Sequence, residues 1–167
     1  IIKNAGFNHA GGKLAVNGVI NPEKVTHYNL SADVNGVDVS KFMYAFDNFG
    51  LESLSPENLK GQFYARADVS GSLNQSGALV PRSVNGNITF TLKRGKLINF
   101  DPIVSVGKFA FPFRDVKNIE FKDLNGKLNL HGEKVEVAPM KISSSVLNMD
   151  VQGVYSFGKG TQLYIDV

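Results

Sequence analysis

A group of acidic side chains offers the first chemistry to test in this 167-residue sequence. Asp115, Glu120 and Asp123 lie close together in the chain, and two carboxyl groups at a suitable distance are sufficient to hydrolyse a glycosidic bond. Arg114 and Lys122 compensate their charge, and nothing in this charge-compensated stretch would raise the pKa of one carboxyl for general acid catalysis. We therefore interpret this group as ordinary surface charge.

The three histidines, His9, His27 and His131, are the other candidates for catalysis or metal binding. None has a carboxylate or a second histidine at metal-ligand spacing, and the absence of cysteine excludes thiolate chemistry. The sequence also lacks the glycine-rich signatures of nucleotide binding and the G-x-S-x-G elbow of serine hydrolases. These observations predict a protein that is not an enzyme and has no metal and no cofactor.

The charge distribution argues against nucleic acid as a partner. The formal charge is +3, from 18 basic and 15 acidic residues spread through the chain. The densest basic places, Lys93-Arg94 and the stretch 117–122, have acidic or apolar neighbours, whereas a nucleic-acid binder concentrates Lys and Arg into a stripe. The sequence starts at Ile1, ends in an apparent strand and has no apolar run long enough to span a membrane. We expect it to be a fragment whose parent carries any membrane anchor elsewhere.

Alternation of apolar and polar residues with a period of two dominates the chain and predicts half-buried strands. Ile88, Phe90 and Leu92 fall on one side of such a strand, and Thr89 falls on the other. The stretch 147–151 alternates in the same way. Asn35-Gly36 interrupts another alternating segment and predicts a hairpin turn there.

A short motif of the form G-K-L-x-Φ-x-G, where Φ is aliphatic, occurs at residues 12–18 and again at residues 126–132. Repeated short strands between glycines are typical of a meander in which each strand pairs with its sequence neighbours. We therefore predict one mainly β domain over residues 1–167, an elongated, curved antiparallel β-meander with a groove-like sheet. The alternative is a sandwich in which the glycines mark ordinary hairpin turns.

One or two short helices are expected to interrupt the strands. Phe42, Met43, Phe46 and Phe49 recur at helical spacing between residues 40 and 49. A second helix is predicted from Asp101-Pro102 to Pro112, with Ile103, Val106 and Phe109 on one face. Each helix could pack as a small lid across the sheet or insert into a membrane.

The remaining feature is apolar surface, supplied by strand faces, twelve Phe and five Tyr. If the sheet curls, an apolar concave side would suit acyl chains, because burial of each methylene contributes about 0.8 kcal/mol. A structural or protein-interaction module that binds through exposed strand edges, without lipid, is the alternative, and a carbohydrate-binding sandwich is a weaker one because Trp is absent. The residues expected to contact lipid, or else to form plain core, are Phe42, Phe46, Ile88, Phe90, Leu92, Leu147, Met149 and Val151.

Several short elements, best matched over residues 59–167, resemble the C-terminal region of AsmA-family proteins. They are Leu59 to Phe63 (L-K-G-Q-F), Val84 to Phe90 (V-N-G-N-I-T-F), Arg94 to Ile103 (R-G-K-L-I-N-F-D-P-I), Ile119 to Gly126 (I-E-F-K-D-L-N-G) and Val137 to Ser145, which contains P-M-K-I-S-S.

The resemblance implies an AsmA/TamB-like protein of a Gram-negative envelope, anchored in the inner membrane and extending into the periplasm. Members of this group are thought to form long β-grooves that carry phospholipid in outer-membrane lipid transport and assembly. The family pattern contains no catalytic residues. The expected partners are therefore phospholipid or another acyl lipid, and envelope proteins that pair with a strand edge.

Overall fold

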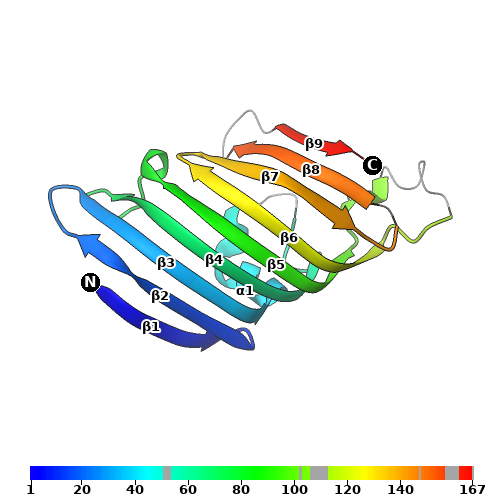
Figure 1. Cartoon of the computed structure of the whole chain (residues 1–167), viewed down its shortest axis with the longest axis horizontal. Helices are drawn as coiled ribbons and strands as arrows, with labels where there is room; N and C mark the ends of the chain where they lie inside the picture. The colour runs from blue at the N-terminus through cyan, green and yellow to red at the C-terminus, as the bar shows by residue number, and fades with distance from the viewer. Residues whose placement is uncertain (51–53, 102, 106–112, 147, 157–161, 167) are drawn as a thin grey trace.

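The chain folds as one open, nine-stranded antiparallel sheet in the computed structural model, which describes residues 1–50, 54–101, 103–105, 113–146, 148–156 and 162–166. The strand order in the sheet is β1 to β9, so each strand pairs with its neighbours in the chain, and the predicted meander is confirmed (Figure 1). The elements are β1 (Ile2–His9), β2 (Gly12–Asn21), β3 (Thr26–Asp38), α1 (Val39–Ala45), the 3-10 helix η1 (Asp47–Gly50), β4 (Leu59–Leu73), the 3-10 helix η2 (Pro81–Ser83), β5 (Asn85–Ile98), β6 (Asn118–His131), β7 (Lys134–Ser143), β8 (Asn148–Ser156) and β9 (Gln162–Asp166).

The two faces of the sheet differ in chemistry because residues opposite each other in paired strands point to the same side. Ala67 of β4 lies opposite Ala32 of β3 and Ile88 of β5, and Ile88 lies opposite Leu128 of β6. The residues between them, such as Thr89, point to the other side and are polar. We name the two sides the inner face, which carries the apolar set, and the outer face, which carries the polar set.

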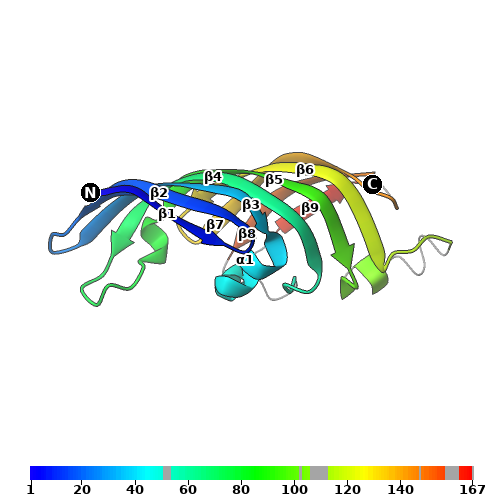
Figure 2. The ribbon, with the colours of Figure 1, turned by 90° about the horizontal axis from the view of Figure 1, so that it is seen from below.

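The sheet is strongly curved, and it arches over its inner face (Figure 2). Register shifts interrupt the pairing of β3 with β4 at Asn35-Gly36 and the pairing of β4 with β5 at Gly61. Gly36 and Gly61 have φ angles of 68° and 136°, which glycine adopts without strain. Such bulges bend and twist a strand. The predicted hairpin turn at Asn35-Gly36 is therefore wrong: β3 continues through this dipeptide as a bulged strand.

The predicted helix at residues 40–49 is confirmed as α1, followed by η1. The Asp38 side chain caps the start of α1 by accepting a hydrogen bond from the Lys41 backbone N–H at 3.0 Å. Val39, Phe42 and Met43 are buried, and the helix lies on the inner side of the arch (Figure 2). Of the second predicted helix, Asp101 and residues 103–105 are helical, and Val106 and Phe109 lie outside the described residues.

Fully buried side chains gather beneath α1 and at the neighbouring bend of the sheet. Leu92, at 2% exposure, packs with Val39 and Met43, and a second cluster joins Val116 with Ile119. The accessible surface of the chain is 10774 Å². A compact protein of 18.2 kDa would expose about 8,100 Å², roughly 2,700 Å² less. The fold therefore leaves an unusually large share of its surface in contact with solvent, as a single curved layer must.

Candidate apolar binding face

A row of small and aliphatic side chains crosses the centre of the inner face. Val16, Ala32, Ala67, Ile88 and Leu128 follow one another on β2 to β6, in register across each strand pair. All are half-buried, in contrast to the fully buried cluster beneath α1. Because the side chains of the two adjacent alanines are short, the surface of the inner face lies close to the backbone at β3 and β4. Hydrocarbon therefore has apolar atoms to contact in the middle of the arch.

Aromatic rings connect α1 with this row. The ring centroids of Phe46 and Phe42 lie 4.9 Å apart, those of Phe42 and Phe63 lie 5.8 Å apart, and those of Phe63 and Phe90 lie 6.0 Å apart. The Phe90 ring lies over Gly126, where an added Cβ atom would be 2.4 Å from its Cζ atom. Successive rings at these distances attract one another. The run gives the inner face a continuous aromatic border from the helix to β6.

The residues predicted to contact lipid divide between this face and the core. Ile88, Phe90, Met149 and Val151 are half-buried, and the strand pairing places all four on the inner face. Leu92 of β5 is buried beneath α1, and Phe42 is a buried residue of α1 itself. Both side chains therefore hold the helix on the sheet. Phe46 is 46% exposed at the end of the helix. Leu147 lies outside the described residues.

The sequence prediction missed the central residues Ala32, Ala67 and Gly126. The alternation of apolar and polar residues in β3, β4 and β6 includes these three positions. A small residue does not indicate an apolar site, however, when each strand is considered alone. Only the register shows that the two alanines meet and that Gly126 makes room for Phe90.

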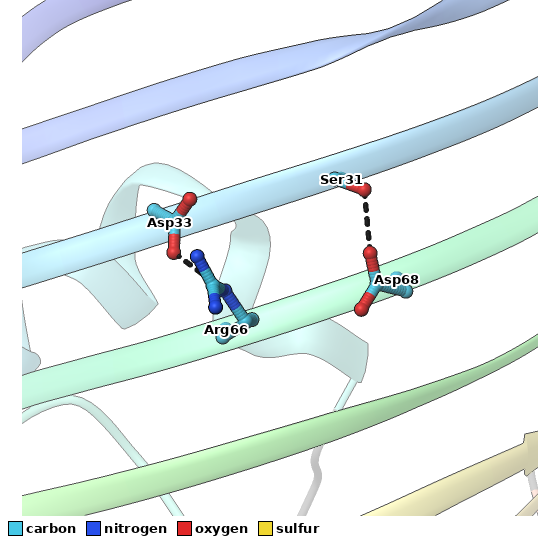
Figure 3. A network of polar contacts seen from close by, with 4 residues as sticks. All are labelled: Ser31, Asp33, Arg66 and Asp68. Carbon is cyan, nitrogen blue, oxygen red and sulfur yellow. Dashed lines mark hydrogen bonds and ion pairs between the residues drawn. The ribbon is translucent and has the colours of Figure 1, made fainter.

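The outer face is a solvated polar surface. The Ser31 hydroxyl donates a hydrogen bond of 2.5 Å to Asp68, and Arg66 forms an ion pair of 3.0 Å with Asp33 between the same two strands (Figure 3). Hydrogen bonding to the Asp33 carboxylate raises the pKa of the Arg66 guanidinium. Both partners of the ion pair are largely exposed. The chemical contrast between the faces therefore directs any apolar ligand to the inner one.

The contacts of the acidic group Asp115, Glu120 and Asp123 do not favour a role in hydrolysis. Hydrogen bonds from the Asn118 side chain and then from the Lys117 backbone lower the pKa of Asp115, which is the opposite of what a general acid needs. Glu120 forms an ion pair of 2.8 Å with Lys96. Within the described ranges, no three His, Cys, Asp or Glu side chains are grouped so as to hold a metal ion. These contacts agree with the interpretation of the acidic residues as surface charge.

The polar pair closest to a catalytic arrangement joins Ser72 and His27, whose Oγ and Nδ1 atoms lie 3.0 Å apart. Nucleophilic catalysis by such a pair also needs a group that orients the imidazole and donors for an oxyanion. The Ser72 backbone N–H already donates to the Ser83 hydroxyl at 2.8 Å. Among the described side chains, no carboxylate forms a hydrogen bond or ion pair with His27. The pair therefore joins the start of β3 to the end of β4.

Comparison with protein-family models, curated proteins and solved structures found no match for this chain. No helix in the described part of the chain has the length and apolar character needed to cross a membrane.

Proposed function

We propose that the inner face binds the acyl chains of phospholipid or a related lipid, and that the chain works as a module of an AsmA-like envelope protein in the periplasm that guides lipid between membranes. The observation that carries this proposal is the row of half-buried apolar residues that runs in register across the arch, opposite a polar outer face. The resemblance of residues 59–167 to AsmA-family proteins supports the same function. The module acts by binding and orienting hydrocarbon rather than by catalysis.

The available surface is sufficient for this role. The chain exposes roughly 2,700 Å² more than a compact protein of its mass, and its inner face is the apolar side of that single layer. Transfer of a 16-carbon chain from water to such a face is worth on the order of 10 kcal/mol before ordering costs are subtracted. Binding at this face therefore requires no hydrogen-bonding group at a particular position, which agrees with a site made of Ala, Val, Ile, Leu and Phe.

A charged residue in the centre of the row tests the proposal directly. Ala67→Glu places a carboxylate between Ala32 and Ile88, and the half-buried position allows the new side chain to reach solvent without unfolding the sheet. Thr89→Glu is the matched control because Thr89 lies on the outer face between Arg66 and Lys127, whose positive charges favour a carboxylate there.

The measurement is the affinity for a fluorescent phospholipid, together with native mass spectrometry of protein purified from bacterial cells. Displacement of even two methylenes from the face corresponds to about a tenfold loss, so Ala67→Glu is expected to weaken binding at least tenfold and Thr89→Glu to leave it unchanged. Equal affinities for wild type and Ala67→Glu, with thermal unfolding confirming that both are folded, would refute lipid binding at this face.

Strand addition is the second candidate function. Within the described chain β1 pairs only with β2, and Phe7 is exposed on β1 directly opposite the buried Leu14. An added strand with an apolar residue beside Phe7 would complete this end of the inner face. This candidate predicts concentration-dependent association that Phe7→Lys abolishes, measured by sedimentation velocity.

A further inference from the structure

A hollow of about 320 Å³ lies on the outer face where β2, β3 and β4 run side by side, at the opposite end of β3 from α1 (Figure 1). Side chains of paired strands line it in two neighbouring rows, Val19, Asn29 and Ser70 in one and Asn21, His27 and Ser72 in the other. Ligand pockets in proteins have volumes of about 300–1,000 Å³. The hollow is therefore large enough for a small molecule.

Serine hydroxyl groups fix one wall of the hollow. Ser72 is 8% exposed, and its Oγ atom lies 3.0 Å from His27 Nδ1. The Ser72 backbone N–H donates to the Ser83 hydroxyl at 2.8 Å, and that hydroxyl donates to the Val80 carbonyl oxygen at 2.7 Å. Because Ser72 is itself held in place, it fixes the His27 ring through Nδ1. The other ring nitrogen, His27 Nε2, forms no hydrogen bond with the described residues.

The amides of Asn21 and Asn29 also have unused hydrogen-bonding groups. Both side chains are exposed, and neither forms a hydrogen bond within the described part of the chain. Each amide provides two donors and an acceptor oxygen. Elsewhere on the outer face polar side chains pair across strands, as Ser31 does with Asp68. Asn21 lies directly opposite His27, so donors and acceptors that are open to a ligand gather at one place.

The hollow combines these polar groups with apolar surface and lacks fixed charge. Val19 is 39% exposed on a face that is mainly polar. No Asp, Glu, Lys or Arg of the described residues lines the hollow. An anion would call for a cationic partner, and a hard cation would call for carboxylates. A neutral sugar ring matches the lining better, because its C–H groups form apolar faces and its hydroxyl groups surround them.

We propose that this hollow binds a neutral saccharide. The amides of Asn21 and Asn29 and the His27 ring bond the sugar hydroxyls, and Val19 contacts the C–H face of one ring. The site goes beyond the proposed lipid function and does not depend on it, because the hollow and the apolar row lie on opposite faces of the sheet. The sequence has no Trp to stack on a sugar, so we expect affinity in the millimolar range.

The test is an NMR titration of the full nitrogen-15-labelled chain with four neutral trisaccharides, namely maltotriose, cellotriose, mannotriose and chitotriose. At least one is expected to shift the side-chain amide signals of Asn21 and Asn29 to saturation and to leave those of Asn87 unchanged. Inorganic phosphate, the charged probe, is expected to shift none of them. The proposal is overturned if no trisaccharide shifts these signals at tens of millimolar, or if phosphate alone does.

A matched pair of variants locates the binding. Asn29→Ala is expected to weaken the trisaccharide at least about fivefold, since it removes up to two hydrogen bonds. Asn87→Ala is the control, because Asn87 is also an exposed asparagine of the outer face, opposite Asp68, and should bind as wild type. Val19→Thr keeps the shape of the side chain and replaces a methyl group by a hydroxyl, so it should weaken binding about threefold.

Equal affinities of Asn29→Ala and Asn87→Ala, with both spectra showing a folded protein, would place the saccharide elsewhere and overturn the proposal. Uptake of a fluorescent phospholipid separates this site from the inner face. Asn29→Ala should retain phospholipid uptake, whereas Ala67→Glu should lose it and still bind the trisaccharide.

Discussion

The contact between Gly95 of β5 and Phe121 of β6 makes a sharp prediction about the bend of the sheet. A Cβ atom added at Gly95 would lie 1.9 Å from Cε2 and 2.3 Å from Cδ2 of the Phe121 ring, far inside van der Waals contact. Gly95 has no left-handed backbone angle, so alanine is compatible with the main chain itself. The effect of Gly95→Ala therefore reports the displacement of one ring.

The cost follows from where Phe121 packs. Its ring packs against both buried clusters, the one containing Leu92 and the one containing Ile119, so a displacement of the ring disturbs the packing of both. It must move by about 1.5 Å to restore ordinary contact, and overpacking of this kind costs about 1–3 kcal/mol. Replacement of a strand glycine returns roughly 0.5–1 kcal/mol of backbone entropy. We expect Gly95→Ala to lower the free energy of unfolding by about 1–2 kcal/mol.

Urea unfolding measures this loss as a lower midpoint with an unchanged slope. The matched control is Gly6→Ala in β1, where the nearest atom to an added Cβ is the Leu14 carbonyl oxygen at 3.7 Å, and no loss is expected. Adding Phe121→Leu to Gly95→Ala should cost less than the sum of the two single changes by about 1 kcal/mol, because the shorter side chain relieves the overlap. If Gly95→Ala is as mild as Gly6→Ala, or if the two changes simply add, the packing argument fails.

Three further predictions concern polar contacts. Asp38→Ala removes the N-cap of α1 and should lower the free energy of unfolding by about 1 kcal/mol, whereas Asp38→Asn should retain most of it in the same urea assay. Arg66→Ala should leave the urea midpoint unchanged at any salt concentration, because its ion pair with Asp33 is largely exposed. Carbon-13 NMR should show Asp115 titrating with a pKa below 3.8, the ordinary value for an aspartate, and Asn118→Ala should raise this pKa towards 3.8. Since the folded pKa is lowered, the stability that Asp115 contributes is present above pH 3.8 and is lost as the pH falls through the folded pKa.

Alternation along the chain was enough to predict the sheet and the division of its faces. Ile88 and Leu92 lie four positions apart on one strand, and their pattern correctly places them on the same side. The sequence did not show that Leu92 would be buried while Ile88 stays half-buried, because that difference depends on α1 folding back over one end of β5. Burial on a shared face is a property of the assembled sheet rather than of the strand.

The bulge at Asn35-Gly36 shows the same limit for local signals. The dipeptide has the backbone freedom that a hairpin turn needs, and Gly36 does adopt a positive φ of 68°. The flanking residues nevertheless pair with β4 on both sides of the bulge, Val34 with Ala65 and Val37 with Phe63. Continued pairing outweighs the local preference for reversal, so the dipeptide bends the strand and does not end it.

The strictly sequential order of the strands has a consequence for how such a protein changes in length. Because every strand takes its partners from the adjacent stretches of chain, duplication or deletion of one hairpin would alter the span of the arch by two strands, about 10 Å, and leave all other pairings in place. The related motifs at 12–18 in β2 and 126–132 at the end of β6 are the trace that growth by hairpin duplication would leave. In this architecture, the width of the sheet can change during evolution by whole hairpins, while the packing of the remaining strands stays the same.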